Sequence, residues 1–263
     1  MVSAPVMQAD SPSVDRKSYV ALGVRVDAVR MSEVVSQLRR WIDSGARGVY
    51  VAVTGMHGLS EAKQDPQFRT ILNAAGLVVP DGMPLVWMAR LHGIGIRRRV
   101  YGPELLDTFC AETRGEYRHF FYGAGPGVAQ KLAHKLENRF GIVVAGTYTP
   151  PFRPLTDDED AEVRAMIESS RADILWVGLS TPKQERWMYA HRHNISVPVM
   201  LGVGAAFDIN SDRVTRTPIF IQEHGLEWLY RLVREPKRLW KRYLIQIPRV
   251  AVSVCLELMG FSQ

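Results

Sequence analysis

The chain has 263 residues, of which 46% are hydrophobic and 23% charged, and its formal net charge is +6. This composition is typical of a globular protein and excludes a disordered chain, a collagen-like chain and a coiled coil. A chain of this length forms one large domain or two small ones and buries a substantial core. Its two cysteines, Cys110 and Cys255, lie far apart and form no motif. We therefore expect no disulfide framework and a reducing compartment.

Short apolar runs alternate with helical patterns along most of the chain. The predicted strands span residues 19–26, 49–53, 76–79, 118–122, 142–145, 173–177 and 197–201. The predicted helices span residues 31–43, 57–74 in two pieces around Pro66, 82–91, 103–114, 127–139, 157–170 and 182–192. Continuous apolar strands are buried on both faces, as in a parallel sheet. The alternation predicts a Rossmann-like α/β fold, with a mostly parallel sheet and helices on both faces.

The two ends differ from this alternating region. Residues 1–18 are polar and lack an apolar run, so we expect a flexible tail and no signal peptide. Residues 19–212 form the expected catalytic core, and residues 213–263 form a helical, basic, membrane-associating appendage. Pro248, Arg249 and Glu257 interrupt the apolar segment 244–261, which argues against a spanning helix. Two alternatives stay open for that segment: it lies in the membrane interface, or it packs on the core.

The net charge is concentrated in the appendage. Residues 213–249 hold nine Lys and Arg side chains and three Glu, whereas residues 1–212 are nearly neutral. This asymmetry indicates an anionic partner: nucleic acid, a membrane surface or a phosphorylated substrate. Arg231, Arg234, Arg238 and Arg242 recur every three or four residues beside an apolar helix face. Such a basic face binds an anionic membrane surface or holds a diphosphate through bidentate contacts.

Four loops follow predicted strands, at the sheet edge where ligands bind in parallel α/β folds. The first, from Thr54 to Gly58, holds two glycines and His57. It either lets a ligand approach closely or forms a plain turn with a helix start. In the second loop, Asp81 stands between Pro80 and Gly82. Asp81 is either a carboxylate at the opening of the sheet or the N-cap of the following helix.

The third and fourth loops both lead into helices. Gly123, Gly125 and Gly127 form a glycine-rich turn, which either binds phosphate through backbone amides or is a plain tight turn. The fourth loop reaches Thr181-Pro182, predicted as the N-cap and first residue of a helix. Lys183 then stands at the helix end where a cation is disfavoured, which indicates a bound anion.

Two acidic segments resemble metal sites. Residues 157–160 hold an Asp-x-Asp spacing, but they open a helix after Thr156, where acidic side chains are favoured in any case. Residues 208–212 resemble the start of a calcium loop, but Arg213 replaces the glycine and Ile219 stands where Glu is needed. The seven histidines show no metal-ligand spacing on one helix face. We therefore predict no metal site and no cofactor.

A set of short segments in a fixed order gives a more specific signal. They are Pro80-Asp81-Gly82, Arg99-Val100-Tyr101-Gly102, residues 123–127, Gly178 with Pro182-Lys183-Gln184-Glu185, residues 202–208, Arg216-Thr217-Pro218, residues 227–231, residues 235–238 and Arg242-Tyr243. Together they resemble the TagA/WecG/CpsF family of bacterial glycosyltransferases over roughly residues 20–248. The first loop departs from the family's Thr-x-Asn. With residues 84–87 and 149–154, it resembles an exopolysaccharide-type branch.

The resemblance implies transfer of a sugar from a UDP-sugar to a polyprenyl-diphosphate-linked saccharide at the cytoplasmic membrane face, with inversion and without a metal. It implies Asp81 as general base, with Thr54, Arg99 and Gln184 also in the catalytic site. Donor binding is then expected at Gly123, Gly125, Lys183, Gln184 and Asp208, and diphosphate, acceptor and membrane binding at Arg231, Arg234, Arg238 and Arg242. The family often uses UDP-N-acetylmannosamine, but the exopolysaccharide-type features make glucose a competing donor sugar. The sequence leaves a homo-oligomer open.

Two functions from other classes remain as alternatives. A nicotinamide-dependent Rossmann oxidoreductase would use the turn at 123–127, but the chain lacks the Gly-x-Gly-x-x-Gly spacing and the ribose-binding acid. A basic nucleic-acid-binding protein would use the appendage, but no recognised binding motif appears there. We therefore expect no nucleic-acid partner.

Overall fold

A computed structural model describes residues 17–218, 220–221, 226–234 and 236–240. Its centre is a six-stranded sheet in the order β4-β3-β8-β7-β5-β6, with every neighbouring pair parallel. The strands are β3 (Val49–Thr54), β4 (Leu77–Pro80), β5 (Arg118–Gly123), β6 (Val143–Tyr148), β7 (Ile174–Gly178) and β8 (Val199–Gly202). The predicted Rossmann-like parallel sheet is confirmed.

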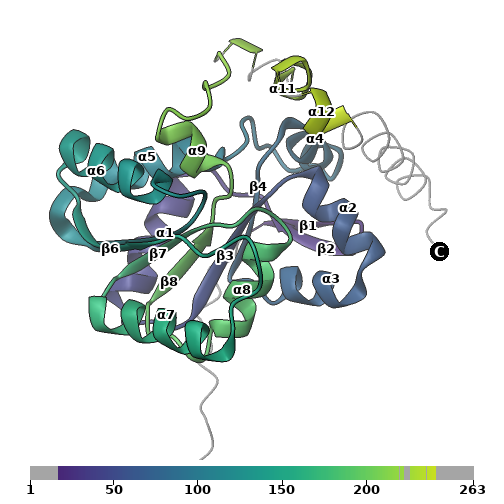
Figure 1. The fold of residues 1–263 in the computed structure, drawn as a ribbon. Helices are drawn as coiled ribbons and strands as arrows, with labels where there is room; N and C mark the ends of the chain where they lie inside the picture. The colour runs from purple at the N-terminus through teal and green to yellow at the C-terminus, as the bar shows by residue number, and fades with distance from the viewer. Residues whose placement is uncertain (1–16, 219, 222–225, 235, 241–263) are drawn as a thin grey trace, which may run out of the picture.

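Helices cover both faces of this sheet (Figure 1). They are α1 (Met31–Asp43), α2 (Met56–Gln64), α3 (Pro66–Asn73), α4 (Met83–Leu91), α5 (Gly102–Thr113), α6 (Val128–Phe140), α7 (Asp157–Ser170), α8 (Lys183–His191) and α9 (Ala206–Asn210). Successive strand residues alternate between two buried clusters: Tyr50 and Ala52 belong to one, Val51 and Val53 to the other. Because both faces are apolar, the strands read as continuous apolar runs.

The first predicted strand is wrong in one respect. Residues 19–26 form two antiparallel strands, β1 (Ser18–Ala21) and β2 (Val24–Asp27). The chain reverses at Leu22 and Gly23, whose φ angles are 52° and 77°. Buried residues continue on both sides of the turn, so the apolar pattern conceals it. The hairpin packs beside β4, and the Tyr19 hydroxyl donates to the carbonyl of Leu85 at 2.6 Å.

The described residues beyond the core include the short helices α11 (Glu227–Arg234) and α12 (Pro236–Trp240). Figure 1 shows them on the side of the molecule where α4 and α9 follow the C-terminal ends of β4 and β8. Arg242, the segment 244–261 and almost all of the expected tail lie outside the described residues. Within the part of the chain that the structure describes, no helix is long and apolar enough to cross a membrane.

Candidate active site

The first and second predicted loops meet at the C-terminal edge of the sheet. The Asp81 amide donates to the carbonyl of Thr54 at 2.9 Å. Gly55 lies so close to the backbone of Asp81 that a Cβ there would come within 2.5 Å of its carbonyl oxygen. A Cβ on Gly58 would overlap the Thr54 hydroxyl. The two glycines of this loop are therefore required for close packing.

Asp81 presents its carboxylate at this edge rather than capping a helix. The N-cap of α4 is Gly82, with a φ of 147° and no side-chain capping bond. The alternative in which Asp81 caps the helix is therefore wrong. The Asp81 side chain keeps 28% of its surface exposed, and its Oδ1 lies 3.9 Å from the guanidinium of Arg99. This distance exceeds hydrogen-bond reach, so this contact with Arg99 is an ion pair and not a hydrogen bond.

Arg99 connects this carboxylate to the appendage. Its guanidinium forms an ion pair with Glu227 at the start of α11, and only 13% and 10% of the two side chains are exposed. It also lies 4.2 Å from the ring centre of Tyr101. Burial alone would lower the pKa of Arg99, but Asp81 and Glu227 outweigh it and raise that pKa. Arg99 therefore stays charged between two carboxylates, one from the core and one from the appendage.

No role for Glu227 was predicted from the sequence. It is one of the three acidic residues in the basic segment and the first residue of the segment 227–231 that carries the family resemblance. The available signal was its position, since an acid at the head of a basic amphipathic helix breaks the pattern of that helix. An acid in the first turn of a helix is also favoured by the helix dipole, so this signal was ambiguous.

Gln184 lies at the fourth loop, beside the end of β8. Its side chain is buried, with 2% of the residue exposed, and its amide nitrogen is near Gly202. The predicted N-cap at Thr181 is wrong: α8 begins at Lys183 after Pro182, and the Thr181 hydroxyl donates to Glu185 Oε1 at 2.8 Å. The Thr181 hydroxyl, which an N-cap would use to bond a backbone amide, is instead bonded to the Glu185 side chain. Lys183 itself is exposed.

The third loop lies against the fourth and against the chain beyond β8. Gly123 has a φ of 128°, and a Cβ there would come within 2.6 Å of the carbonyl oxygen of Gly178. A Cβ on Gly125 would come within 2.7 Å of the Arg213 guanidinium, which in turn lies 3.4 Å from Asp208. Arg213 thus brings two of the predicted donor-binding residues together. In the sequence, Arg213 is one of the nine basic residues of 213–249 and breaks a calcium loop, and neither feature predicts this contact.

The predicted appendage arginines are only partly described. Arg234 lies 5.3 Å from the ring centre of Tyr230, on its own helix. Arg231 and Arg238 belong to α11 and α12, and Arg242 lies outside the described residues. Their assignment to a diphosphate, the acceptor and the membrane stays a prediction.

The glycosyl transferase WecG/TagA/CpsF family model matches residues 19–263. The chain belongs to this family. It is 30% identical over 226 residues to a Bacillus spizizenii protein named N-acetylglucosaminyldiphosphoundecaprenol N-acetyl-beta-D-mannosaminyltransferase, with 85% of each chain covered. Proteins of the same name from Bacillus subtilis and Staphylococcus aureus are 28% and 24% identical, over 74% and 89% of this chain and 75% and 93% of theirs. Membership favours sugar transfer over the oxidoreductase and nucleic-acid alternatives.

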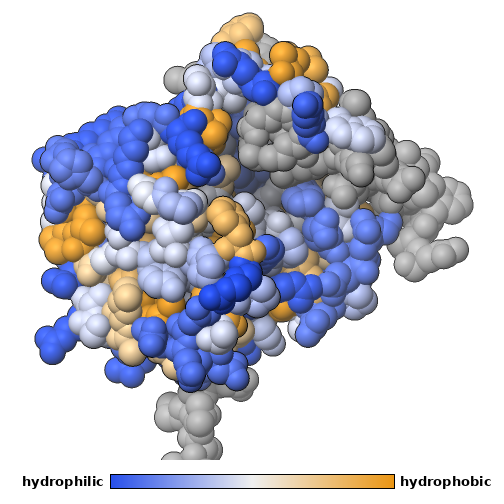
Figure 2. All heavy atoms as spheres, viewed as in Figure 1, coloured by the Kyte–Doolittle hydropathy of each residue, from blue (hydrophilic) through white to orange (hydrophobic). Residues whose placement is uncertain are grey.

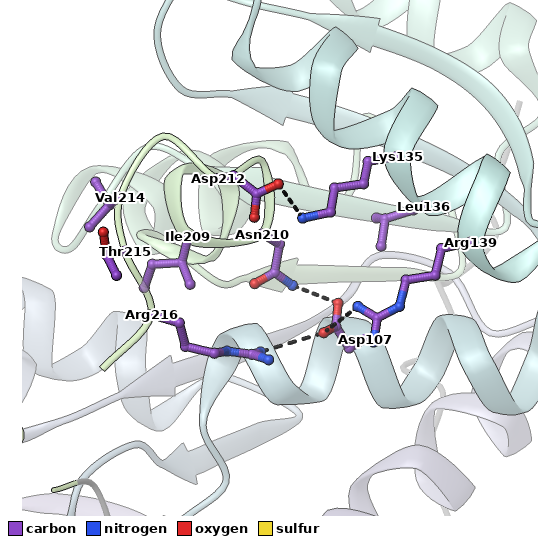
Figure 3. Close-up of a pocket in the computed structure, with 10 residues that line it drawn as sticks. All are labelled: Asp107, Lys135, Leu136, Arg139, Ile209, Asn210, Asp212, Val214, Thr215 and Arg216. Atoms are coloured by element: carbon purple, nitrogen blue, oxygen red, sulfur yellow. Dashed lines mark hydrogen bonds and ion pairs between the residues drawn. The ribbon is translucent and has the colours of Figure 1, made fainter. Parts of the chain in front are cut away.

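This WecG/TagA/CpsF-family chain also has a polar pocket of about 360 Å³ between α5, α6 and the segment after α9 (Figure 3). Its charged side chains pair with one another. Lys135 contacts Asp212 at 2.6 Å, and Asp107 lies 3.4 Å from Arg139 and 3.5 Å from Arg216. These pairs hold the chain that leads to the appendage against the core. The predicted site residues lie elsewhere.

The acidic run at the start of α7 has structural partners. Glu159 forms a capping box with Thr156 and an ion pair with Arg153 at 2.6 Å. Asp160 contacts Arg164 at 3.0 Å and His191 at 2.9 Å. Among the residues that the structure describes, no group of three or more His, Cys, Asp or Glu side chains is arranged to hold a metal ion. The helix start and these ion pairs account for Glu159 and Asp160.

Proposed function

We propose that this family member is an inverting, metal-independent glycosyltransferase. It transfers a sugar from a UDP-sugar to a polyprenyl-diphosphate-linked saccharide. The observation that carries the proposal is the triplet at the sheet edge, where an accessible Asp81 lies beside Arg99 and Arg99 pairs with Glu227 of the appendage. The triplet combines a base with a permanent cation, and these are the two groups that sugar transfer to a hydroxyl requires.

The chemistry follows from these two groups. The Asp81 carboxylate takes the proton of the acceptor hydroxyl as its oxygen attacks the anomeric carbon. The bond between that carbon and the diphosphate oxygen breaks, and its electron pair leaves with UDP. Attack from the face opposite the leaving group inverts the anomeric centre. Arg99 and the appendage arginines stabilise the charge that develops on the diphosphate.

Donor binding is assigned to the third and fourth loops. Support comes from the tight glycine contacts, which pack Gly123 against the backbone of Gly178 and Gly125 against Arg213, and from Arg213 beside Asp208. The relatives' names make N-acetylmannosamine one donor sugar to test. The exopolysaccharide-type resemblance of the first loop and of residues 84–87 and 149–154 makes glucose the other.

The appendage is assigned to the membrane. Its exposed large apolar side chains include Trp228, Leu229, Val233 and Trp240, which stand among Lys and Arg. A helix with apolar residues on one face and cations on the other binds an anionic interface. Figure 2 shows apolar and charged surface mixed in this part of the molecule. We place the protein peripherally on the inner face of the cell membrane, where its lipid-linked acceptor is held.

A donor panel tests this function. Purified protein is incubated with UDP-glucose, UDP-N-acetylmannosamine, its uronic acid and further UDP-sugars, together with polyprenyl-diphosphate-linked acceptors. Products are read by mass spectrometry, with and without EDTA. We expect one added sugar residue from one donor, unaffected by EDTA. Absence of transfer from every donor would contradict the proposal, and activity lost in EDTA and restored by Mn²⁺ would contradict metal independence.

A further inference from the structure

Glu185 is a buried carboxylate in the first turn of α8, to which neither the proposed chemistry nor the family comparison gives a role. None of its surface is exposed. Its Oε1 accepts the Thr181 hydroxyl at 2.8 Å and the Gln184 amide nitrogen at 3.1 Å. Because Oε1 accepts both hydrogen bonds, the contact fixes the amide-nitrogen end of the Gln184 carboxamide against Glu185.

The other end of that carboxamide is then left for a ligand. Gln184 Oε1 is buried and accepts no hydrogen bond from any residue that the structure describes. It lies near Gly204, where a Cβ would stand 3.5 Å away, and a Cβ on Gly202 would come within 2.9 Å of the amide nitrogen. Two glycines therefore make room for this amide at the end of β8.

The end of β8 is where a ligand crevice is expected. In the sheet order, β3 and β4 extend to one side of β8, while β7, β5 and β6 extend to the other. Ligands in open α/β sheets bind where the strand order reverses, beyond the C-terminal ends. Thr54, at the end of the neighbouring β3, also has a buried hydroxyl without a hydrogen-bond partner among the described residues.

The chemistry of these atoms selects the ligand. Gln184 Oε1 is an acceptor, Glu185 Oε2 is a second buried acceptor without a donor among the described residues, and Thr54 is a hydroxyl. Buried polar atoms normally have partners. A phosphate offers mainly acceptors and would be repelled by a carboxylate, whereas the hydroxyl groups of a sugar offer donors. The cluster therefore fits a sugar ring.

We propose that Glu185 is a positioning residue, which holds the Gln184 carboxamide so that its oxygen accepts a hydrogen bond from a hydroxyl group of the bound sugar. This inference rests on the proposed function. Burial raises the pKa of Glu185, although hydrogen bonds from Thr181 and Gln184 act in the opposite direction. Burying a carboxyl group costs free energy. The orientation that Glu185 imposes on the Gln184 amide gives a reason for this group to be buried here.

A purely structural role, in which Glu185 only secures the start of α8, makes a different prediction. A double-mutant cycle separates the two. The variants are Glu185→Met, Glu185→Gln, Gln184→Met and the double variant Gln184→Met with Glu185→Met. Thr113→Val is the control, because it removes a buried hydrogen bond at the opposite edge of the sheet, from Thr113 to the carbonyl of Phe109 at 2.7 Å.

We expect Glu185→Met to lower kcat/KM for the sugar substrate by about ten- to hundredfold, since a buried hydrogen bond to substrate is lost. Glu185→Gln keeps an acceptor oxygen and should stay within about threefold of the wild type. In the Gln184→Met background, Glu185→Met should cost less than about threefold, because coupled residues are not additive. Thr113→Val should lower thermal stability and leave kcat/KM unchanged. If the fold-losses in kcat/KM of the two single Met variants multiply in the double variant, the proposal is overturned.

A second readout does not depend on turnover. In NMR spectra of the intact protein, we expect the side-chain amide protons of Gln184 to exchange slowly with solvent in the wild type and in Glu185→Gln. The same protons should exchange quickly in Glu185→Met. Unchanged exchange in Glu185→Met would overturn the positioning role, even in a protein that failed the donor panel. If the wild type transfers sugar but the Gln184 amide protons exchange slowly in every variant, including Glu185→Met, this inference is contradicted and the proposed function stands.

Discussion

The ion pair between Arg99 and Glu227 gives the sharpest mutational prediction for the appendage. Glu227→Ala removes the carboxylate that α11 contributes to Arg99 and leaves the Asp81 carboxylate in place, 3.9 Å away. Removing one partner of a buried ion pair costs about 3–5 kcal/mol. Because 10–13% of the two side chains remains exposed, we expect Glu227→Ala to weaken the free energy of docking of α11 on the core by about 2–4 kcal/mol.

If the docked appendage is the active form, this loss appears in kinetics. Each 1.36 kcal/mol corresponds to a factor of ten, so kcat/KM should fall by about 30- to 1000-fold. The assay is sugar transfer to a polyprenyl-diphosphate-linked acceptor in vesicles, combined with limited proteolysis of the appendage. We expect Glu227→Ala to be cut faster than the wild type, and Glu227→Asp, which keeps the charge, to recover most of the activity.

The matched control is a second Arg–Glu pair on the surface. Glu116 contacts Arg39 at 2.6 Å, with half of the Glu116 side chain exposed. Exposed pairs contribute about 0–1 kcal/mol, so Glu116→Ala should leave kcat/KM and the cleavage pattern unchanged. Wild-type kinetics and cleavage in Glu227→Ala would refute the link between this ion pair and appendage docking.

Three further predictions test other parts of the molecule. A chain ending at residue 212 should keep the circular dichroism of its α/β core but lose sugar transfer and vesicle co-sedimentation together; full activity would contradict the role of the appendage. Gly58→Ala places a Cβ on the Thr54 hydroxyl and should lower the free energy of unfolding by about 1–3 kcal/mol. That loss should shrink when Thr54→Ala is added. Burial lowers the pKa of His119 from 6.5 to about 3, so the unfolded chain binds a proton between these values that the folded chain does not. The contribution of His119 to the free energy of unfolding is therefore fully present above pH 6.5 and should fall by about 1.4 kcal/mol per pH unit below it. In urea melts from pH 7 to pH 5, His119→Asn should show a smaller pH dependence.

The sequence predicts the sheet well because burial on both faces leaves a local signal. Each strand of the central sheet is a short apolar run, and α1 and α7 begin and end at the predicted residues. The hairpin turn at Leu22 and Gly23 was missed because its burial pattern continues through the reversal. The pairing order of the strands was not predicted either, since it depends on contacts between residues far apart in the chain.

In the candidate site, the positions of the residues could be predicted from the sequence, but their partners could not. The positions of Thr54, Asp81 and Gln184 at strand ends follow from the α/β pattern, because the C-terminal ends of parallel strands share one edge. The partners of these residues do not follow from it. Glu227 reaches Arg99 across 128 positions of sequence, and Arg213 reaches Gly125 across 88. Spacing motifs do not encode such contacts, so the two charged residues looked like ordinary members of a basic segment.

The most direct test of the account replaces the proposed base. Asp81→Asn keeps the size and polarity of the side chain but cannot take a proton, and Asp81 does not cap α4. On the donor and acceptor pair identified by the panel, we predict an unchanged melting temperature and a kcat lowered by about 10²–10⁴, with the product of the wild-type enzyme having the inverted anomeric configuration. A variant that turns over at nearly the wild-type rate would contradict the central claim that Asp81 is the general base of a sugar transfer.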